Sequence, residues 1–148
     1  MHSAAHPLVV ASLFVASAAP AADGETLFNE SCAACHQRGG AGSAGLAPPL
    51  VDRALWDRLG RAAPEYIQGV MLAGLSGSIE VAGQQYVGLV MPPQARMTDD
   101  ELAAIGRYVL STLNAMRNPT LTAATVAALR SAPPTHSVLR EMRKKSEK

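Results

Sequence analysis

The densest group of reactive side chains in this 148-residue sequence is the run Cys32-Ala33-Ala34-Cys35-His36. Two thiols three positions apart can lie on one helical turn and form thioethers with the two vinyl groups of a porphyrin. The histidine that follows can then place a ring nitrogen under the iron. A C-x-x-C-H run is typical of covalent haem attachment, and this run contains both cysteines of the chain. We therefore predict one covalent haem c, bound through Cys32 and Cys35, with His36 as an axial ligand of the iron.

Other uses of a C-x-x-C pair fit the sequence less well. A thiol–disulfide redox centre is expected in a strand–helix–strand setting, which the flanking sequence does not indicate. A structural zinc ion needs four ligands, but the chain has no other cysteine, and its remaining histidines (His2, His6 and His136) are near the two ends. A simple structural disulfide is an alternative in an exported protein.

The second axial ligand is expected to be Met91. The chain has six methionines, and Met91 precedes Pro92, which favours an extended conformation of the residue before it. Met91 is also predicted to lie in a loop, from which a thioether can point across a pocket. Packing in the core is the usual role of a methionine, and Met97 and Met71 are alternative ligands.

A His/Met pair would fill both axial positions of the iron. The thioether favours the reduced iron and raises its potential, and the filled sites leave no position for a substrate or O₂. The chain also shows no convincing acid–base or nucleophilic group of residues elsewhere. These features favour electron transfer over catalysis, so we do not expect the protein to be an enzyme.

Several further residues are candidates for contact with the haem. A metal-bound histidine normally donates its other N–H to a carbonyl or carboxylate, and the Pro48 carbonyl, in a loop rich in Gly, Ala and Pro, is a good acceptor for His36. Trp56, with Arg53 or Arg58, can donate hydrogen bonds to the propionates. Packing for Trp56 and a solvated surface for the arginines are the alternatives.

Hydrophobic periodicity and capping residues predict mainly helices around these groups. We expect helices over residues 23–34, from Pro64 to about Leu75, from the capping box at Thr98 to about Asn114, and from Thr122 to Arg130. Residues 79–89 are expected to form a small hairpin or an extended loop. Tyr86 in this segment can line the haem crevice, although core packing is an equal alternative.

The N-terminal 21 residues are typical of a secretory signal peptide. The apolar run from Leu8 to Ala19 is too short to span a bilayer, and Ala19-Pro20-Ala21 resembles a cleavage site. The segment before the run has no Lys or Arg, so an uncleaved anchor or a buried N-terminal helix is the alternative. Export to the periplasm is consistent with haem attachment, which takes place outside the cytoplasm.

The order of these motifs resembles that of class I c-type cytochromes over about residues 23–130. The resemblance is carried by Phe28, the Cys32–His36 run, Pro48-Pro49-Leu50, Met91-Pro92 and a final helix containing Tyr108. It implies an all-α cytochrome c fold, with three to five helices wrapped round one covalently bound haem and with long loops. It also implies that the first and last helices cross near Gly24/Phe28 and Ile105/Tyr108. On this basis residues 22–118 are the cytochrome c domain and residues 119–148 a C-terminal extension.

The middle of the chain is similar to cytochromes that serve periplasmic dehydrogenases. The similarity rests on Trp56, residues 74–81, Tyr86 and Met91-Pro92. It implies a one-electron carrier that accepts electrons as the cytochrome subunit or the soluble partner of a dehydrogenase. A terminal oxidase or another cytochrome would accept them, with membrane contact only through a complex. Residues 115–117 depart from this pattern, because relatives often carry Trp-Gly there. A haem enzyme or gas sensor with an open sixth position is the alternative function.

Charge is distributed unevenly along the chain. The formal net charge is +1, which gives no nucleic-acid-binding signature. Residues 22–129 carry −3, whereas residues 130–148 carry +4. We expect the basic end after Pro134 to be poorly ordered in isolation. It either steers docking to an acidic partner or is a solubilising end.

Overall fold

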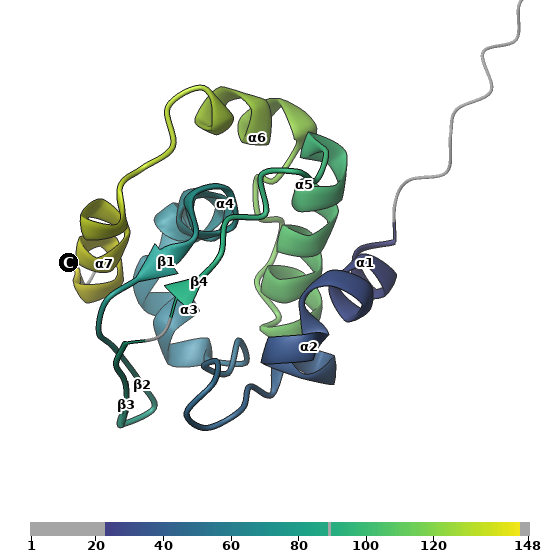
Figure 1. Ribbon diagram of the computed structural model, residues 1–148. Helices are drawn as coiled ribbons and strands as arrows, with labels where there is room; N and C mark the ends of the chain where they lie inside the picture. Colours follow the sequence, from purple (N-terminus) through teal and green to yellow (C-terminus); the bar gives the residue numbers. More distant parts are fainter. Residues whose placement is uncertain (1–22, 89, 146–148) are drawn as a thin grey trace, which may run out of the picture.

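The computed structural model describes residues 23–88 and 90–145, which form seven α-helices and two small antiparallel sheets (Figure 1). The helices are α1 (Gly24–Ser31), α2 (Ala33–His36), α3 (Arg53–Leu59), α4 (Ala63–Ala73), α5 (Asp99–Arg107), α6 (Ala123–Arg130) and α7 (His136–Lys144). The strands are β1 (Leu75–Ser76), β2 (Ile79–Val81), β3 (Gln84–Tyr86) and β4 (Val90–Met91). The predicted all-α class is confirmed, with more helices than the three to five expected. The predicted signal peptide lies outside the described residues.

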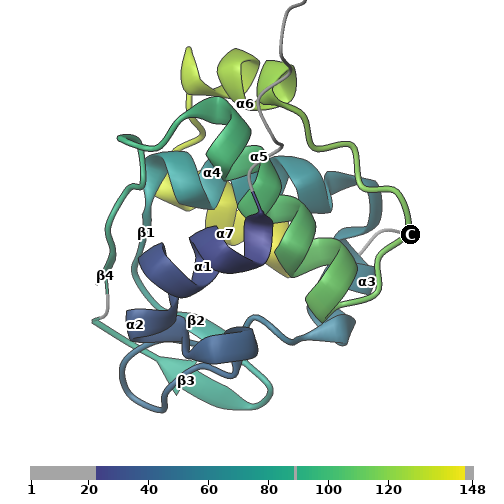
Figure 2. The ribbon, with the colours of Figure 1, turned by 90° about the vertical axis from the view of Figure 1, so that its right-hand side faces the viewer.

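Helices α1 and α5 cross in close contact, as Figure 2 shows. The crossing depends on Gly24, because a Cβ at this position would collide with the backbone carbonyl of Ala104. The rings of Phe28 and Tyr108 then meet with their centroids 5.4 Å apart. The side chain of Asp23 accepts hydrogen bonds from two backbone N–H groups of the first turn of α1, which fixes where the helix begins. The crossing lies where the resemblance placed it.

Helix α5 begins at the predicted capping box, in which Thr98 and Glu101 bond to each other's backbone N–H groups. A π-helical turn over Tyr108–Leu113 continues it to Asn114, the predicted end. The buried Asn114 amide donates to the carbonyls of Leu50 and Val109 and accepts from the N–H of Asp52. The end of this helix therefore holds the loop that leads into α3.

The other elements differ from the prediction mainly at their ends. The first predicted helix is interrupted at Cys32 and becomes α1 and α2. Helix α4 covers most of the predicted second helix, and β2 and β3 form a hairpin in the 79–89 segment. Helix α3 was not expected. It begins after Asp52, whose side chain caps the N–H of Leu55, and it buries an apolar face that includes Trp56.

The basic C-terminal segment was expected to be poorly ordered in isolation; in the structure its described part is helix α7, docked on the body. Helix α7 packs against α3, α4 and β1 (Figure 1). Thr135 caps it, and Leu139 is completely buried. A side chain at Gly69 would meet Leu139 and Pro134, so the bare backbone of α4 makes room for the docked helix. None of the described helices is both long and apolar enough to cross a membrane.

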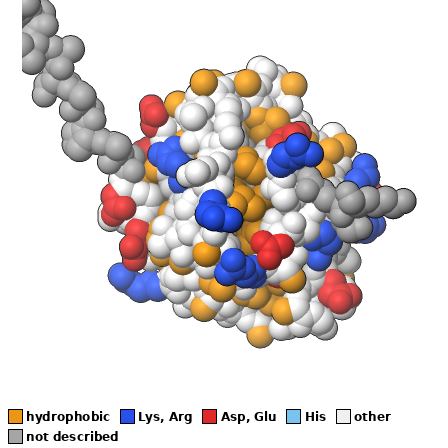
Figure 3. Space-filling model, turned by 180° about the vertical axis from the view of Figure 1, so that it is seen from behind, with side chains coloured by type: hydrophobic (Ala, Val, Ile, Leu, Met, Phe, Trp, Pro, Cys, Tyr) orange, Lys and Arg blue, Asp and Glu red, His pale blue; other side chains and the backbone are white. Residues whose placement is uncertain are grey.

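Charged side chains of both signs are mixed on the surface seen in Figure 3, around a strip of apolar side chains. Part of the positive charge of the C-terminal segment is engaged with the body, since Arg140 donates to the Ser76 carbonyl at 2.6 Å and Arg143 to the Tyr66 hydroxyl at 3.1 Å. Lys144 pairs with Glu141 within the same helix. The segment is therefore a docked helix rather than a free cationic tail.

Candidate haem site

A mostly apolar cavity of about 290 Å³ lies between the first helices, helix α4 and the β1–β4 pair. The three residues of the attachment motif and Met91 all line it. Side chains from α3 and α5 complete its wall. The residues that line it include Cys32, Cys35, His36, Leu46, Pro48, Trp56, Tyr66, Met71, Tyr86, Val90, Met91 and Arg143. The fold thus brings together segments that are far apart in the sequence.

The His36 imidazole is buried and held by the expected backbone carbonyl. Its Nδ1 lies 3.0 Å from the Pro48 oxygen, so Nδ1–H donates and Nε2 is left as the free lone pair. Burial lowers the pKa of His36, and the hydrogen bond to Pro48 opposes that shift. The neutral ring, with its free Nε2, is the form that binds a metal.

A tight loop places the Pro48 carbonyl over the ring. The Gly42 N–H donates to the His36 carbonyl at 2.7 Å, and the Leu50 N–H donates to the Gly40 carbonyl at 2.7 Å. Gly42 has φ +74°, and a Cβ there would lie 2.7 Å from the Pro48 carbonyl carbon. Only glycine combines that backbone conformation with so close an approach. The loop is therefore built for the contact between His36 and Pro48.

Both cysteines are free thiols, so the disulfide alternative is not formed in the described structure. Cys32 is half-buried and Cys35 is exposed. Burial, with a smaller Coulombic contribution from Cys35, raises the pKa of Cys32 to about 11. Both cysteines line the cavity from one helical turn, as two thioether bonds to a single flat ring require.

Met91 lines the cavity from β4, which pairs with β1 through Leu75. Gly74, at φ +74°, lets the chain pass against the Met91 carbonyl, where a Cβ would collide. Met71 also lines the cavity, but its terminal methyl is directed at Gly106 in the core. Met97 packs against the core cluster and is not among the residues that line the cavity. Of the three methionines considered as ligands, Met91 therefore lies where an axial ligand is expected, in the cavity wall and not directed into the core.

The described residues fit a covalently bound haem. The cavity offers two free thiols, one imidazole nitrogen without a protein partner and the Met91 thioether, and its remaining wall is mostly apolar. An apolar wall suits the porphyrin, and N and S donors suit its iron.

Of the residues predicted to contact the haem, Trp56 and Tyr86 lie in the cavity wall, whereas Arg53 and Arg58 lie outside it. Trp56 and Tyr86 line the cavity, but the Trp56 indole N–H donates to the Leu50 carbonyl at 2.9 Å. Arg53 makes a long, exposed ion pair with Asp57, and Arg58 donates to a backbone carbonyl of α7. Neither arginine lines the cavity, so the donors expected for the propionates are engaged elsewhere.

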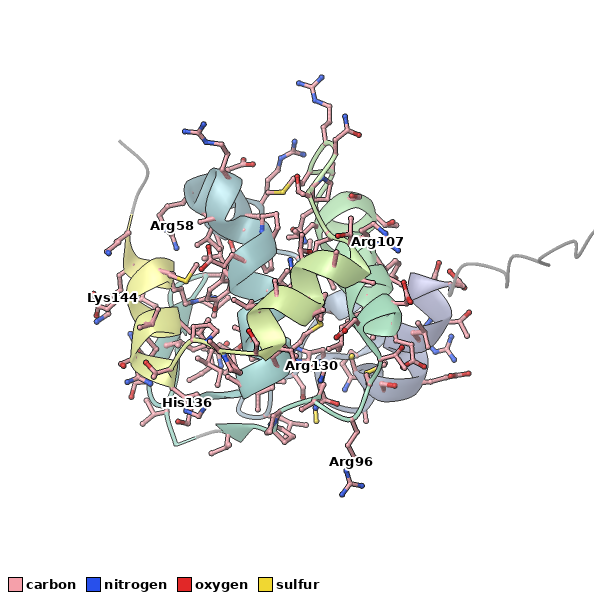
Figure 4. All side chains as sticks on the ribbon, turned by 90° about the horizontal axis from the view of Figure 1, so that it is seen from above. Arg58, Arg96, Arg107, Arg130, His136 and Lys144 are labelled. Carbon is pink, nitrogen blue, oxygen red and sulfur yellow. The ribbon has the colours of Figure 1, made fainter. Side chains whose placement is uncertain are left out.

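Two arginines near the site were not predicted to have a role. Arg143, from α7, lines the cavity and donates to the Tyr66 hydroxyl at 3.1 Å. Arg130, at the end of α6, donates to the Asp99 carboxylate and to two backbone carbonyls of the 95–99 segment. Arg96 in that segment extends away from the body (Figure 4).

The apolar residues Leu139 and Met142, a helical turn apart after Thr135, were the available sequence signal that α7 forms. No short-range sequence pattern predicts which groups Arg143 and Arg130 bind.

Residues 21–113 match the family model of cytochrome c. The chain is 39% identical over 88 residues to cytochrome c-552 of Thermus thermophilus, a match that covers 60% of this chain and 66% of the relative. A second cytochrome c-552, from a named strain of the same species, matches with the same identity over 60% of this chain and 58% of that relative. The chain therefore spans slightly less than two thirds of the length of these relatives.

Proposed function

Because the chain belongs to the cytochrome c family, we propose that it is a one-electron carrier whose haem c has His36 and Met91 as its axial ligands. The observation that supports this most strongly is that His36 and Met91, from distant segments, line the same apolar cavity. The imidazole already has its Nδ1 engaged by Pro48, so its Nε2 is available to the iron. When bound, the haem supplies one-electron redox chemistry.

The protein side of this function is to hold both ligands in place and to exclude water. With His36 and Met91 both bound to the iron, neither a substrate nor O₂ would have a coordination position, and the mostly apolar wall would limit the entry of water. Cys35, Leu46 and Val90 are among the exposed residues of the cavity wall, the last two by 50% and 67%. This exposed edge gives a partner a short, uncharged route to the cofactor.

The partners and the location are part of the same proposal. The similarity of residues 74–92 to cytochromes of periplasmic dehydrogenases supports a dehydrogenase as the donor, with this chain as its cytochrome subunit or soluble partner. A terminal oxidase or another cytochrome would be the acceptor. The apolar run from Leu8 to Ala19 and the cleavage-like Ala21 support export to the periplasm. A direct test is reduction of the purified holoprotein by a periplasmic extract when alcohol or aldehyde substrates are added.

The axial ligand is tested by Met91→Ala, with Met97→Ala as the matched control. In the oxidised protein we expect the sulfur-to-iron charge-transfer band to disappear in Met91→Ala and to persist in Met97→Ala. The reduction potential should fall only in Met91→Ala, because axial ligands tune haem potentials over about 0.8 V and the thioether favours reduced iron. Visible spectroscopy and a redox titration measure both effects.

Two results would contradict this assignment. An unchanged charge-transfer band in Met91→Ala would exclude Met91 as the ligand. Ready binding of carbon monoxide by the reduced, unmodified protein would show an open iron, and would favour the haem enzyme or gas sensor instead. Met71→Leu then tests the remaining methionine of the cavity wall.

A further inference from the structure

The side chain of Arg143 approaches the haem cavity from outside the region that the family model matches. That match ends at residue 113, and α7 begins at His136. The helix is nevertheless fixed to the body at its start, where His136 Nε2 donates to the Ala73 carbonyl at 3.0 Å, and in its middle, where Leu139 is completely buried. Its last turn is thereby held against the cavity.

Arg143 has incomplete hydrogen bonding for a partly buried guanidinium. One Nη donates to the Tyr66 hydroxyl at 3.1 Å and the other makes a long contact of 3.4 Å with the Glu80 carbonyl. Its Nε is shielded from solvent and has no partner among the described residues. A shielded, charged donor without a partner is unfavourable, so this arrangement calls for an anionic acceptor.

The charged side chains around Arg143 do not supply that acceptor. The Glu80 carboxylate accepts instead from Gln85 at 2.7 Å, and the Glu141 carboxylate pairs with Lys144. Arg58, from α3, is a cation that donates to the Arg143 carbonyl, and Arg140 is a second cation on α7. Because Arg143 lines the cavity, an anionic group of the occupant is placed to be that acceptor.

We propose that Arg143, together with the Tyr66 hydroxyl, binds a propionate carboxylate of the haem, so that the C-terminal helix α7 completes the cofactor site. A guanidinium forms strong, geometrically specific hydrogen bonds with a carboxylate, and a phenol adds one more donor. This inference rests on the proposed function only in that the cavity holds the haem. It replaces Trp56, Arg53 and Arg58 as the expected propionate donors.

The consequence is electrostatic as well as structural. A cation beside the propionate offsets negative charge near the iron and so favours the reduced state. It also stabilises the ionised carboxylate, which keeps the pKa of the propionate low. Loss of Arg143 should therefore lower the reduction potential and move the pH-dependent step of that potential to higher pH.

The test compares the holoproteins of Arg143→Gln and Lys144→Gln, which remove the same charge from neighbouring positions of α7. Figure 4 places Lys144 on the outside of the helix. Redox titrations over a range of pH should show a lower potential and an upshifted pH step in Arg143→Gln only. Arg143→Lys should restore part of the potential, because it keeps the charge but loses the planar fork.

Tyr66→Phe is the second variant, because it removes one hydroxyl and keeps the ring that packs on Trp56. It should shift the pH step in the same direction as Arg143→Gln, but less. The proposal is overturned if Arg143→Gln and Lys144→Gln have the same potential and pH profile, or, should Arg143→Gln yield no holoprotein, if Tyr66→Phe leaves the profile unchanged. The charge-transfer band of the unmodified protein reports separately on Met91, so the two proposals can fail independently.

Discussion

The wall of the cavity that carries His36 and the wall that carries Met91 are built in different ways. The His36 wall is mainly local, since its ligand, its carbonyl partner Pro48 and the backbone bonds that close the loop lie within residues 32–50, with Trp56 and Asn114 adding bonds to the Leu50 carbonyl. The Met91 wall consists of two-residue strands and an exposed segment held by distant groups. The Gln94 N–H donates to the Met71 carbonyl at 2.7 Å, and Arg130 binds the segment from α6.

This difference indicates which ligand is the more easily lost. A wall closed by short-range backbone bonds opens only when its own helix unfolds. A wall held by a few long-range contacts can open locally at a lower free energy. We therefore expect the Met91 side to respond to heat, pH and mutation before the His36 side does, and the variants below test this order.

The largest effect is expected from His36→Ala. Haem attachment and iron ligation both depend on this wall, so the variant should yield little stable holoprotein, whereas Met91→Ala should still carry covalent haem. Haem staining after denaturing electrophoresis, in cells with a working attachment system, measures the yield of each. Normal haem content in His36→Ala would show that the two walls are equally dispensable.

The next largest effect is expected at the crossing that joins the two walls. Helix α1 leads directly into the attachment motif, and α5 follows the Met91 segment. In Gly24→Ala the new methyl group meets the Ala104 carbonyl and lies 3.1 Å from Tyr108 Cβ. Because backbone cannot yield as a side chain does, we expect the free energy of unfolding to fall by about 3 kcal/mol, the upper part of the range for overpacking.

Chemical denaturation measures this loss. Glu30→Ala, on an exposed position of the same helix, is the control and should change stability by no more than about 0.5 kcal/mol. If Gly24→Ala were as stable as the control, α1 and α5 could move apart without loss of free energy of unfolding. The result would mean that neither wall of the cavity depends on this crossing.

The same contrast explains how far the sequence could predict the site. Cys32, Cys35, His36 and Pro48 are close in sequence, so residue types and spacing were enough to propose them. Met91 was proposed from the proline that follows it, and the capping box at Thr98 located α5. The sequence could not reveal Arg143, because its partners Tyr66 and Glu80 are more than sixty positions away. Helix α7 forms through packing on α4 rather than through local signals alone.

Arg130 offers the finest test of the comparison. Its guanidinium donates to the Asp99 carboxylate at 2.8 Å and to the carbonyls of Ala95 and Met97 at 2.7 and 2.8 Å. These bonds hold the chain that leaves Met91 and enters α5. Arg130→Gln cannot reach all three acceptors, so the segment should open more readily while the His36 wall is unchanged.

We expect Arg130→Gln to destabilise the Met91 side by about 1 kcal/mol, less than the figure of about 1.5–3 kcal/mol for charged hydrogen bonds because the ion pair with Asp99 is partly exposed. On heating, the sulfur-to-iron band should be lost at a lower temperature than in the unmodified protein, with helical circular dichroism and haem content retained. Arg96→Gln removes the same charge from the same segment, but its side chain points away from the body (Figure 4), so it should leave the band's transition in place. The opposite result is that every variant loses the band and its helicity at one common temperature. The Met91 wall would then open only when the whole protein unfolds, and the two walls would be equally stable.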